Sequence, residues 1–265
     1  MLGHVRDAYY KRFARKKDKR ISEEKVLELV GLERKDQHRM GTRKLYSTIE
    51  PKIKENDIHC GRDRLFSLLR KNDLLIEPKK RFKKTTYSNH EYALASNRIK
   101  GLVIDRPNQV FVCDITYVSL KTGFAYLFLV TDAYSRKIVG HHFSRDLSHY
   151  SAILALHNAL KNVVNTQGII CHSDRGCQYC CHQYIKQLNQ YGLISSMTSE
   201  SHCYQNAIAE RVNGILKDEF DIDQTFYSFS HAKLSINHAI KIYNTKRKHW
   251  SLNLNTPDFV YANAA

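Results

Sequence analysis

Two aspartates stand in sequence surroundings where a carboxylate needs an explanation. Asp114 interrupts an apolar, β-branched and aromatic run at 110–118, which predicts a buried strand. Asp174 follows a short apolar run at 168–173, at the point where a turn should begin. Because burying an ionised group is costly without a cation or hydrogen bonds, each aspartate is either a satisfied structural acid or a ligand.

A third acid, Glu210, lies in a segment with helical periodicity. Apolar residues recur there every three or four positions, and they are Ile208, Val212, Ile215, Leu216 and Phe220. A second stripe with the same spacing is polar and consists of Asn206, Glu210, Asn213 and Lys217. One helix would therefore present a carboxylate to a metal ion and, two turns further on, an ammonium group to a phosphate.

Each acid also has an ordinary explanation when it is taken alone. Asp114 could be a hydrogen-bonded core acid, Asp174 a turn acid, and Glu210 a solvated helix residue. Taken together, the three favour one shared site for a hard divalent cation, because such cations take oxygen ligands.

The order of the predicted elements indicates how the acids could meet. Three β-rich runs at 109–120, 124–131 and 136–143 predict an antiparallel meander. Helical and strand patterns then alternate, with strands at 168–173 and 193–197 and helices at 148–163, 184–191, 206–220 and 231–243. This order predicts an α/β protein with an RNase H-like fold, in which flanking helices cover a mixed five-stranded sheet.

Positive charge is concentrated in the amino-terminal part of the chain. The formal net charge is +16, and residues 1–100 contain 27 Lys and Arg against 14 Asp and Glu. This asymmetry predicts a basic module that binds a polyanion, followed by a nearly neutral module with another task. Since the sequence shows neither a long apolar run nor a signal-peptide core, we expect a cytoplasmic protein without membrane contact.

Four regions are expected along the chain. They are a basic arm (1–20), a small all-α domain (21–77), a basic linker (78–105) and the α/β core with a C-terminal helical segment (106–265). In the all-α domain, Ser22 should cap the first helix and Thr42 the second, which Pro51 should kink or interrupt.

The third helix of this domain is expected at 62–71. Leu65, Leu68 and Leu69 form its packing face, so that Arg62 and Arg64 are free to point elsewhere. Three short helices with a basic last helix match a helix-turn-helix, whose final helix would enter the DNA major groove. The alternative is a small helical bundle with a solvated basic face.

The cysteines and the single tryptophan allow two interpretations each. The cluster of Cys171, His172, Cys177, Cys180, Cys181 and His182 suggests zinc, but its spacing differs from that of a zinc knuckle, and we expect ordinary side chains. Trp250 follows a basic stretch at 246–249 and either stacks on a base or packs; we expect packing.

Four stretches that include the three acids resemble the integrase catalytic core of bacterial insertion-sequence transposases of the orfB type. They are 107–117, 131–136, 172–179 and 206–217. The spacing adds to the resemblance, since 59 residues separate Asp114 from Asp174 and 35 separate Asp174 from Glu210. Other stretches are similar to the family's helix-turn-helix region (40–45 and 61–66) and to its C-terminal segment (243–247 and 256–257).

The resemblance implies a DNA transposase with a DDE-type catalytic site. Asp114, Asp174 and Glu210 would bind two Mg²⁺ ions, or Mn²⁺ in their place, and the site would nick the ends of an insertion element and join the 3′-hydroxyl to another strand. The residues that would hold DNA are Lys217, Asn206 and Asn213 in the core and Arg62 and Arg64 in the helix-turn-helix.

The resemblance also implies partners and a location. The chain would act on element ends and target DNA as a homo-oligomer in the bacterial cytoplasm, associated with the nucleoid. Fusion or association with an upstream-frame DNA-binding protein is a further implication. Two other functions stay open: a DNA-binding transposition regulator with a catalytically silent core, and a general RNase H-like nuclease that does not join strands.

Overall fold

The computed structural model describes residues 6–77, 94–199 and 206–264. The chain divides into two compact units, Met1–Lys79 and Lys80–Ala265. Each unit has a hydrophobic core of its own. The first part of the predicted linker, at 78–93, lies outside the described residues.

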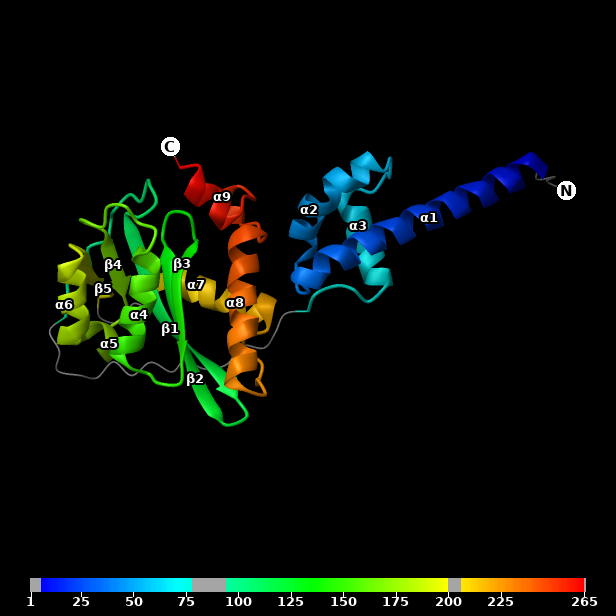
Figure 1. Ribbon diagram of the computed structural model, residues 1–265. Helices are drawn as coiled ribbons and strands as arrows, with labels where there is room; N and C mark the ends of the chain where they lie inside the picture. The colour runs from blue at the N-terminus through cyan, green and yellow to red at the C-terminus, as the bar shows by residue number, and fades with distance from the viewer. Residues whose placement is uncertain (1–5, 78–93, 200–205, 265) are drawn as a thin grey trace. The chain divides into compact units, whose positions relative to one another are not determined.

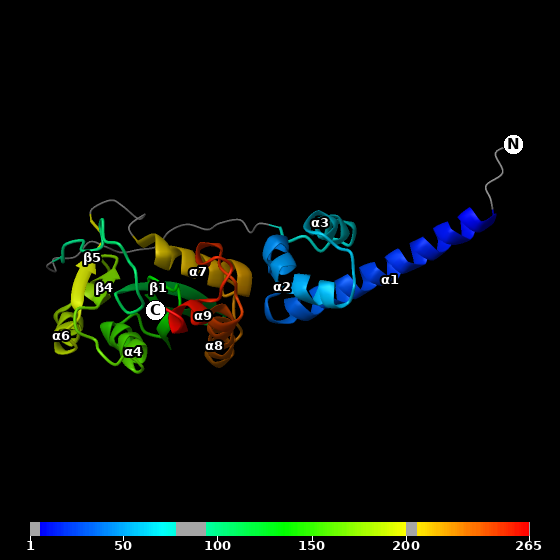
Figure 2. The ribbon, with the colours of Figure 1, turned by 90° about the horizontal axis from the view of Figure 1, so that it is seen from above.

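The amino-terminal unit consists of three helices, α1 (Arg6–Asp36), α2 (Thr42–Glu55) and α3 (Arg62–Lys71). Its core is aliphatic and includes Val26, Val30, Leu45, Ile49, Ile53, Leu65 and Leu69. The first half of α1 extends beyond α2 and α3 (Figures 1 and 2).

Two expectations for these helices were wrong. Ser22 does not cap a helix, because α1 already begins at Arg6 and Ser22 donates a hydrogen bond to the Asp18 carbonyl 2.9 Å away. The described part of the predicted basic arm is therefore helical. Likewise Thr42 does not cap α2, because Gly41 is the N-cap residue and Thr42 is the first helical residue. Pro51 lies inside α2 without interrupting it, since the buried stripe of Leu45, Ile49 and Ile53 stabilises the helix through packing.

The second unit is built on a five-stranded sheet in the order β3-β2-β1-β4-β5. Its strands are β1 (Val110–Leu120), β2 (Gly123–Asp132), β3 (Ile138–Ser144), β4 (Ile170–Ser173) and β5 (Ile194–Met197). The first three pair antiparallel, which confirms the predicted meander, whereas β4 and β5 run parallel to β1. The sheet is therefore mixed, as expected.

Helices cover both faces of this sheet. The helices are α4 (His149–Leu160), α5 (Cys177–Cys180), α6 (His182–Gln190), α7 (Ala207–Phe220), α8 (Phe229–Thr245) and α9 (Pro257–Ala262). Phe111 and Cys113 of β1 pack with α4 and α6, whereas Val118 and Leu120 pack with α7 and α8. Side chains therefore alternate between the two faces along β1, and Figure 2 shows α4 and α7 on opposite sides of that strand. Among the described helices, none is long and apolar enough to cross a bilayer.

Residues 94–105, which the sequence predicted to be linker, pack onto the second unit. Ile99 and Ile104 lie against Val112 and Ala209 in one apolar cluster. The backbone N–H of Arg98 also donates to Ser196 Oγ of β5 at 2.9 Å. This segment was predicted as linker because its apolar residues are sparse, but Ile99 and Ile104 pack into this cluster, whereas Leu94, Leu102 and Val103 stay exposed.

Candidate active site

Asp114 and Asp174 lie on neighbouring parallel strands. In the pairing of β1 with β4, Cys113 is the partner of Ser173, and each aspartate follows directly. Neighbouring strands are about 4.8 Å apart, and residues at equal positions in a parallel pair point to the same face of the sheet. The register therefore brings the two carboxylates together on the face that α7 covers.

The surroundings of Asp114 disfavour its ionised form. The pKa of Asp114 is raised to about 7, chiefly by burial and then by the negative charge of Asp174, with a smaller contribution from Glu210. Hydrogen bonds from the Ile115 N–H (2.9 Å) and from Asn213 Nδ2 (2.5 Å) act in the opposite direction. Asp114 therefore lies within electrostatic reach of both Asp174 and Glu210.

Asp174 is held by the turn that follows it. The N–H of Gly176 donates to Asp174 Oδ1 at 3.0 Å. A Cβ atom at Gly176 would meet that same oxygen at 3.0 Å and Gln178 Oε1 at 3.1 Å, so any side chain here would push against the Asp174 carboxylate. The sequence did not single out Tyr179, a fully buried ring whose pKa burial raises, as do the nearby charges of Cys113, Asp114 and Asp174. Its only sequence signal is an aromatic residue close behind the aspartate.

Helix α7 carries the third acid. Glu210 lies exposed in the first turn of α7, and Asn213, one turn further, reaches Asp114. Lys217 follows on the same side of the helix and is half-buried. Burial lowers the pKa of Lys217, and the negative charge of Asp114 raises it. The polar stripe read from the sequence therefore faces the aspartates.

Two asparagines of this stripe, which were predicted to bind DNA, are buried and bonded to β1. Asn206 is 5% exposed and its Nδ2 donates to the Cys113 carbonyl at 3.4 Å. Asn213 is 8% exposed and bound to Asp114. Within the described part of the chain, Oδ1 of each asparagine is buried and accepts no hydrogen bond.

The donor set fits a hard divalent cation. It consists of carboxylate oxygens, and a cation would relieve the repulsion that raises the pKa of Asp114. Across residues 6–77, 94–199 and 206–264, no three Asp, Glu, His or Cys side chains are already gathered closely enough to enclose a metal ion. This agrees with the exposed position of Glu210.

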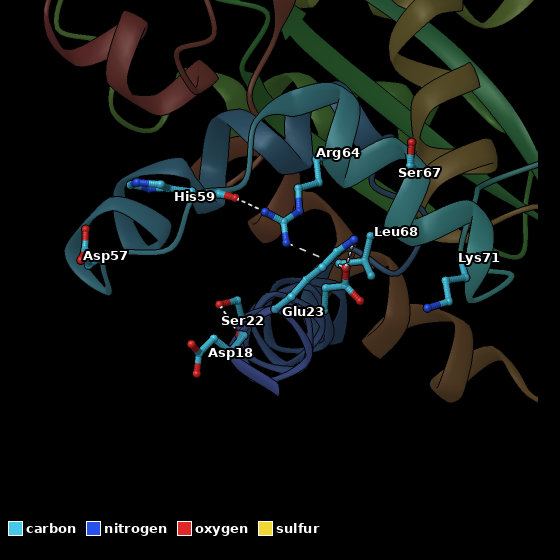
Figure 3. Close-up of a pocket in the computed structure, with 10 residues that line it drawn as sticks. Asp18, Ser22, Glu23, Asp57, His59, Arg64, Ser67, Leu68 and Lys71 are labelled. Carbon is cyan, nitrogen blue, oxygen red and sulfur yellow. Dashed lines mark hydrogen bonds and ion pairs between the residues drawn. The ribbon is translucent and has the colours of Figure 1, made fainter. Parts of the chain in front are cut away.

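The two arginines predicted to bind DNA have different surroundings on α3. Arg62 is exposed and pairs with the neighbouring Asp63 at 3.1 Å. Arg64 instead points into a groove between α1 and α3, where its Nη1 donates to the His59 carbonyl at 2.5 Å and its Nη2 lies 3.9 Å from Glu23 (Figure 3). Arg64 therefore contacts α1 of its own unit.

The cysteine and histidine cluster is largely part of the core. Cys171 and Cys181 belong to the apolar cluster beneath α4 and α6. His172 is fully buried and hydrogen-bonded through Nδ1 to Ser196 Oγ at 2.9 Å. Burial, together with the charge of Asp174, raises the pKa of Cys180 to about 12, so this thiol stays protonated at neutral pH.

The sheet order is that of an integrase core with an RNase H-like fold. Family models described as "Integrase core domain" match residues 104–203 and 191–257. A structure of the simian T-cell lymphotropic virus intasome in complex with PP2A regulatory subunit B56 gamma has a similar fold, with a TM-score of 0.51 and 14% identity over 86% of this chain and 72% of that one.

Curated relatives make the relationship more specific. An uncharacterized 31 kDa protein of insertion element IS600 from Shigella sonnei is 34% identical over 253 residues, which are 94% of this chain and 92% of that protein. Transposase InsF for insertion sequence IS3A from Escherichia coli K12 is 31% identical over 200 residues, 74% of this chain and 69% of the relative. The chain belongs to the insertion-sequence transposases with an integrase core, which are DNA phosphoryl transferases.

Proposed function

We propose that Asp114, Asp174 and Glu210 are the catalytic carboxylates of this transposase and hold two divalent ions, Mg²⁺ or Mn²⁺ in its place. The observation that carries the proposal is the β1–β4 register, in which Asp114 and Asp174 directly follow the paired residues Cys113 and Ser173. The bond from Asn213 of α7 to Asp114 and the raised pKa of Asp114 support it. When bound, such a pair of ions activates an attacking water or 3′-hydroxyl and stabilises the leaving 3′-oxygen.

The chain's own residues prepare this site. Asn213 and the Ile115 N–H orient the Asp114 carboxylate, and the Gly176 N–H orients Asp174. Lys217, on the same side of α7, is positioned to attract a DNA phosphate by its charge. In this arrangement Asn206 donates to the Cys113 carbonyl and Asn213 to the Asp114 carboxylate, so both connect α7 to β1. Neither of them has to contact DNA directly.

We further propose that the amino-terminal unit binds DNA as a helix-turn-helix through the exposed side of α3. Arg62 and Arg70 are exposed there, away from the groove that Arg64 and Lys71 line. Arg64 has a different role in this proposal: its ion pair with Glu23 links α3 to α1, and its bond to the His59 carbonyl links α3 to the loop before it.

The partners in this proposal are element ends, target DNA and further copies of the chain on that DNA. The family resemblance also supports fusion or association with an upstream-frame DNA-binding protein. Such a partner would add a second DNA-binding region to the one proposed here.

The test is a strand-transfer assay with cognate element ends, with and without Mg²⁺. We expect metal-dependent cleavage and joined products, and loss of both in Asp174→Asn at unchanged DNA binding. Cleavage of unrelated DNA without joined products would instead support a general nuclease. Equal DNA binding without cleavage in either protein would support a transposition regulator.

A further inference from the structure

The residues that follow α8 alternate between buried and exposed positions. Arg247 and His249 are 1% and 6% exposed, whereas Lys246 is exposed, Lys248 is half-buried and Trp250 is 57% exposed. Side chains that alternate in burial point to opposite sides of the backbone. Lys246, Lys248 and Trp250 therefore form an outward-facing row. The expectation that Trp250 packs was wrong.

The buried side chains anchor this row from beneath. The guanidinium of Arg247 makes two bonds to the Glu219 carboxylate of α7, through Nε at 2.8 Å and Nη2 at 2.6 Å. The ring of His249 packs edge-on against Tyr243 of α8 at 5.1 Å. Charge-assisted bidentate bonds are short and directional, so the backbone that carries the row is fixed to two helices.

The loop after the row closes on itself. His249 N donates to the Asn255 carbonyl at 3.1 Å, and Leu254 N donates back to the His249 carbonyl at 2.8 Å. Asn253 and Leu254 both adopt the left-handed conformation, with φ of 52° and 62°, which is uncommon for a bulky residue such as leucine. This closed conformation holds Trp250 at the surface.

We infer that Lys246, Lys248 and Trp250 form a DNA-binding row in which the Trp250 ring stacks on an unpaired base and the two ammonium groups contact neighbouring phosphates. This inference rests on the proposed function. Lys248 and Trp250 flank His249, whose backbone is extended (φ −116°, ψ 133°), so these two residues lie about 7 Å apart, and Lys246 caps the end of α8 two residues earlier. Cations combined with an exposed aromatic ring form the usual binding surface for unpaired nucleotides, because every base has a face on which a ring can stack.

The row of Lys246, Lys248 and Trp250 is anchored away from the proposed catalytic carboxylates. Glu219, which anchors the row, lies nine residues after Glu210 in α7, which is about 14 Å along the helix and on its opposite side. The row therefore contacts DNA several nucleotides from the proposed scissile phosphate. It contributes affinity, and the rate of the chemical step at saturating DNA does not depend on it.

Trp250 is the single tryptophan of the chain, so its fluorescence reports on this site alone. The full chain is titrated with an end-labelled duplex that carries an unpaired extension and with the matched blunt duplex. DNA anisotropy and tryptophan emission are followed together. We expect saturable quenching of the emission by the extended duplex, in parallel with its anisotropy, and weaker quenching by the blunt one.

Variants test the two parts of the row. Trp250→Ala should weaken binding of the extended duplex by roughly 5- to 100-fold. The double variant Lys246→Gln/Lys248→Gln should lower the slope of log K against log salt by about 1.4, the value for two phosphate contacts on a single strand. The controls are Tyr150→Ala and Lys161→Gln, which remove an exposed aromatic ring and an exposed cation at the two ends of α4 and should bind like the parent.

Three outcomes would overturn the inference. DNA binding with unchanged Trp250 emission, or with Trp250→Ala equal to Tyr150→Ala, would contradict the row while leaving the transposase function standing. Emission that depends on protein concentration without DNA would make the row a contact between copies of the chain. Binding of neither duplex would contradict the row and the proposed function together.

Discussion

The surroundings of the Asp114 carboxylate disfavour its ionised form. A half-buried acid beside two others is tolerated because hydrogen bonds from Ile115 and Asn213 offset part of the cost. Such an arrangement is typical of sites that complete their electrostatics with a bound ion. The cost of the Asp114 charge and the contribution of its hydrogen bonds can both be measured on the metal-free protein.

The stability of the metal-free protein should fall as the pH rises from about 4 to about 7. The folded-state pKa of Asp114 lies above the ordinary aspartate value of 3.8, so the folded state binds the proton more tightly than the unfolded state does. The stabilisation that protonated Asp114 gives the folded state is fully present below the unfolded-state pKa. It is lost as the pH rises through the folded-state pKa. Urea unfolding at pH 5 and pH 8 should show a decrease that is smaller in Asp114→Asn, by about 2 kcal/mol. An equal decrease in both proteins would contradict the assignment.

Removing the amide of Asn213 should raise the pKa of Asp114 further, because the lost hydrogen bond stabilises the charged form. The measurement is a carboxyl-carbon NMR titration of Asn213→Ala without metal. Asn206→Ala is the matched control, since its amide donates to the Cys113 carbonyl instead. A larger effect in the control would mean that Asn213 does not act on Asp114 directly.

At the scale of elements, the site depends on a turn and on a helix. The turn after β4 fixes Asp174 through Gly176, and α7 carries Glu210, Asn213 and Lys217 on one side. The far end of α7 is tied to the segment after α8 by Arg247 and Glu219. Each connection can be broken separately.

Gly176→Ala should slow metal-dependent cleavage by roughly 10- to 100-fold, because the new Cβ displaces the Asp174 carboxylate. Gly214→Ala is the matched control. Its Cβ would meet nothing within 4 Å in the interior of α7, so it should stabilise the protein by about 0.5–1 kcal/mol and leave the cleavage rate unchanged. Single-turnover cleavage rates and thermal unfolding temperatures distinguish the two variants. Equal cleavage rates in both would show that the Gly176 turn does not position Asp174 for cleavage.

Arg247→Met should destabilise the second unit by about 3–5 kcal/mol, because the Glu219 carboxylate loses its bidentate partner. The double variant Arg247→Met/Glu219→Leu should recover most of this loss, since it leaves no unpaired charge. Urea unfolding of both variants is the measurement. A double variant that is less stable than the single one would contradict this account of the pair.

At the scale of the whole molecule, the chain joins two units with separate cores. The amino-terminal unit is packed by aliphatic residues of three helices, while the second unit is packed on both faces of one sheet. Most of the excess positive charge lies in residues 1–100. Folding and DNA affinity should therefore respond separately to changes in each unit.

Leu65→Ala should destabilise the amino-terminal unit by about 2–5 kcal/mol, because Leu65 is fully buried in its core. Calorimetry should show one lowered transition and one that is unchanged. DNA binding should weaken at the temperature where the first unit unfolds. Joint loss of both transitions would show that the units fold as one.

Much of the fold and of the candidate site is determined by local sequence. Strands β1 to β3 and helix α3 were predicted closely, because alternating or helical spacing of apolar residues depends on neighbours only. The three acids were also found from the sequence, since a charged residue in or after an apolar run is visible without coordinates. Their roles as metal ligands remain a proposal.

Only the tertiary structure decided which groups each polar side chain meets. Asn206 and Asn213 belong to one stripe in the sequence, yet only Asn213 reaches Asp114. Arg64 faces α1 of its own unit, and Trp250 lies outside the core because its neighbours anchor the loop beneath it. Burial and hydrogen-bond partners come from residues distant in the chain, so local patterns do not contain them.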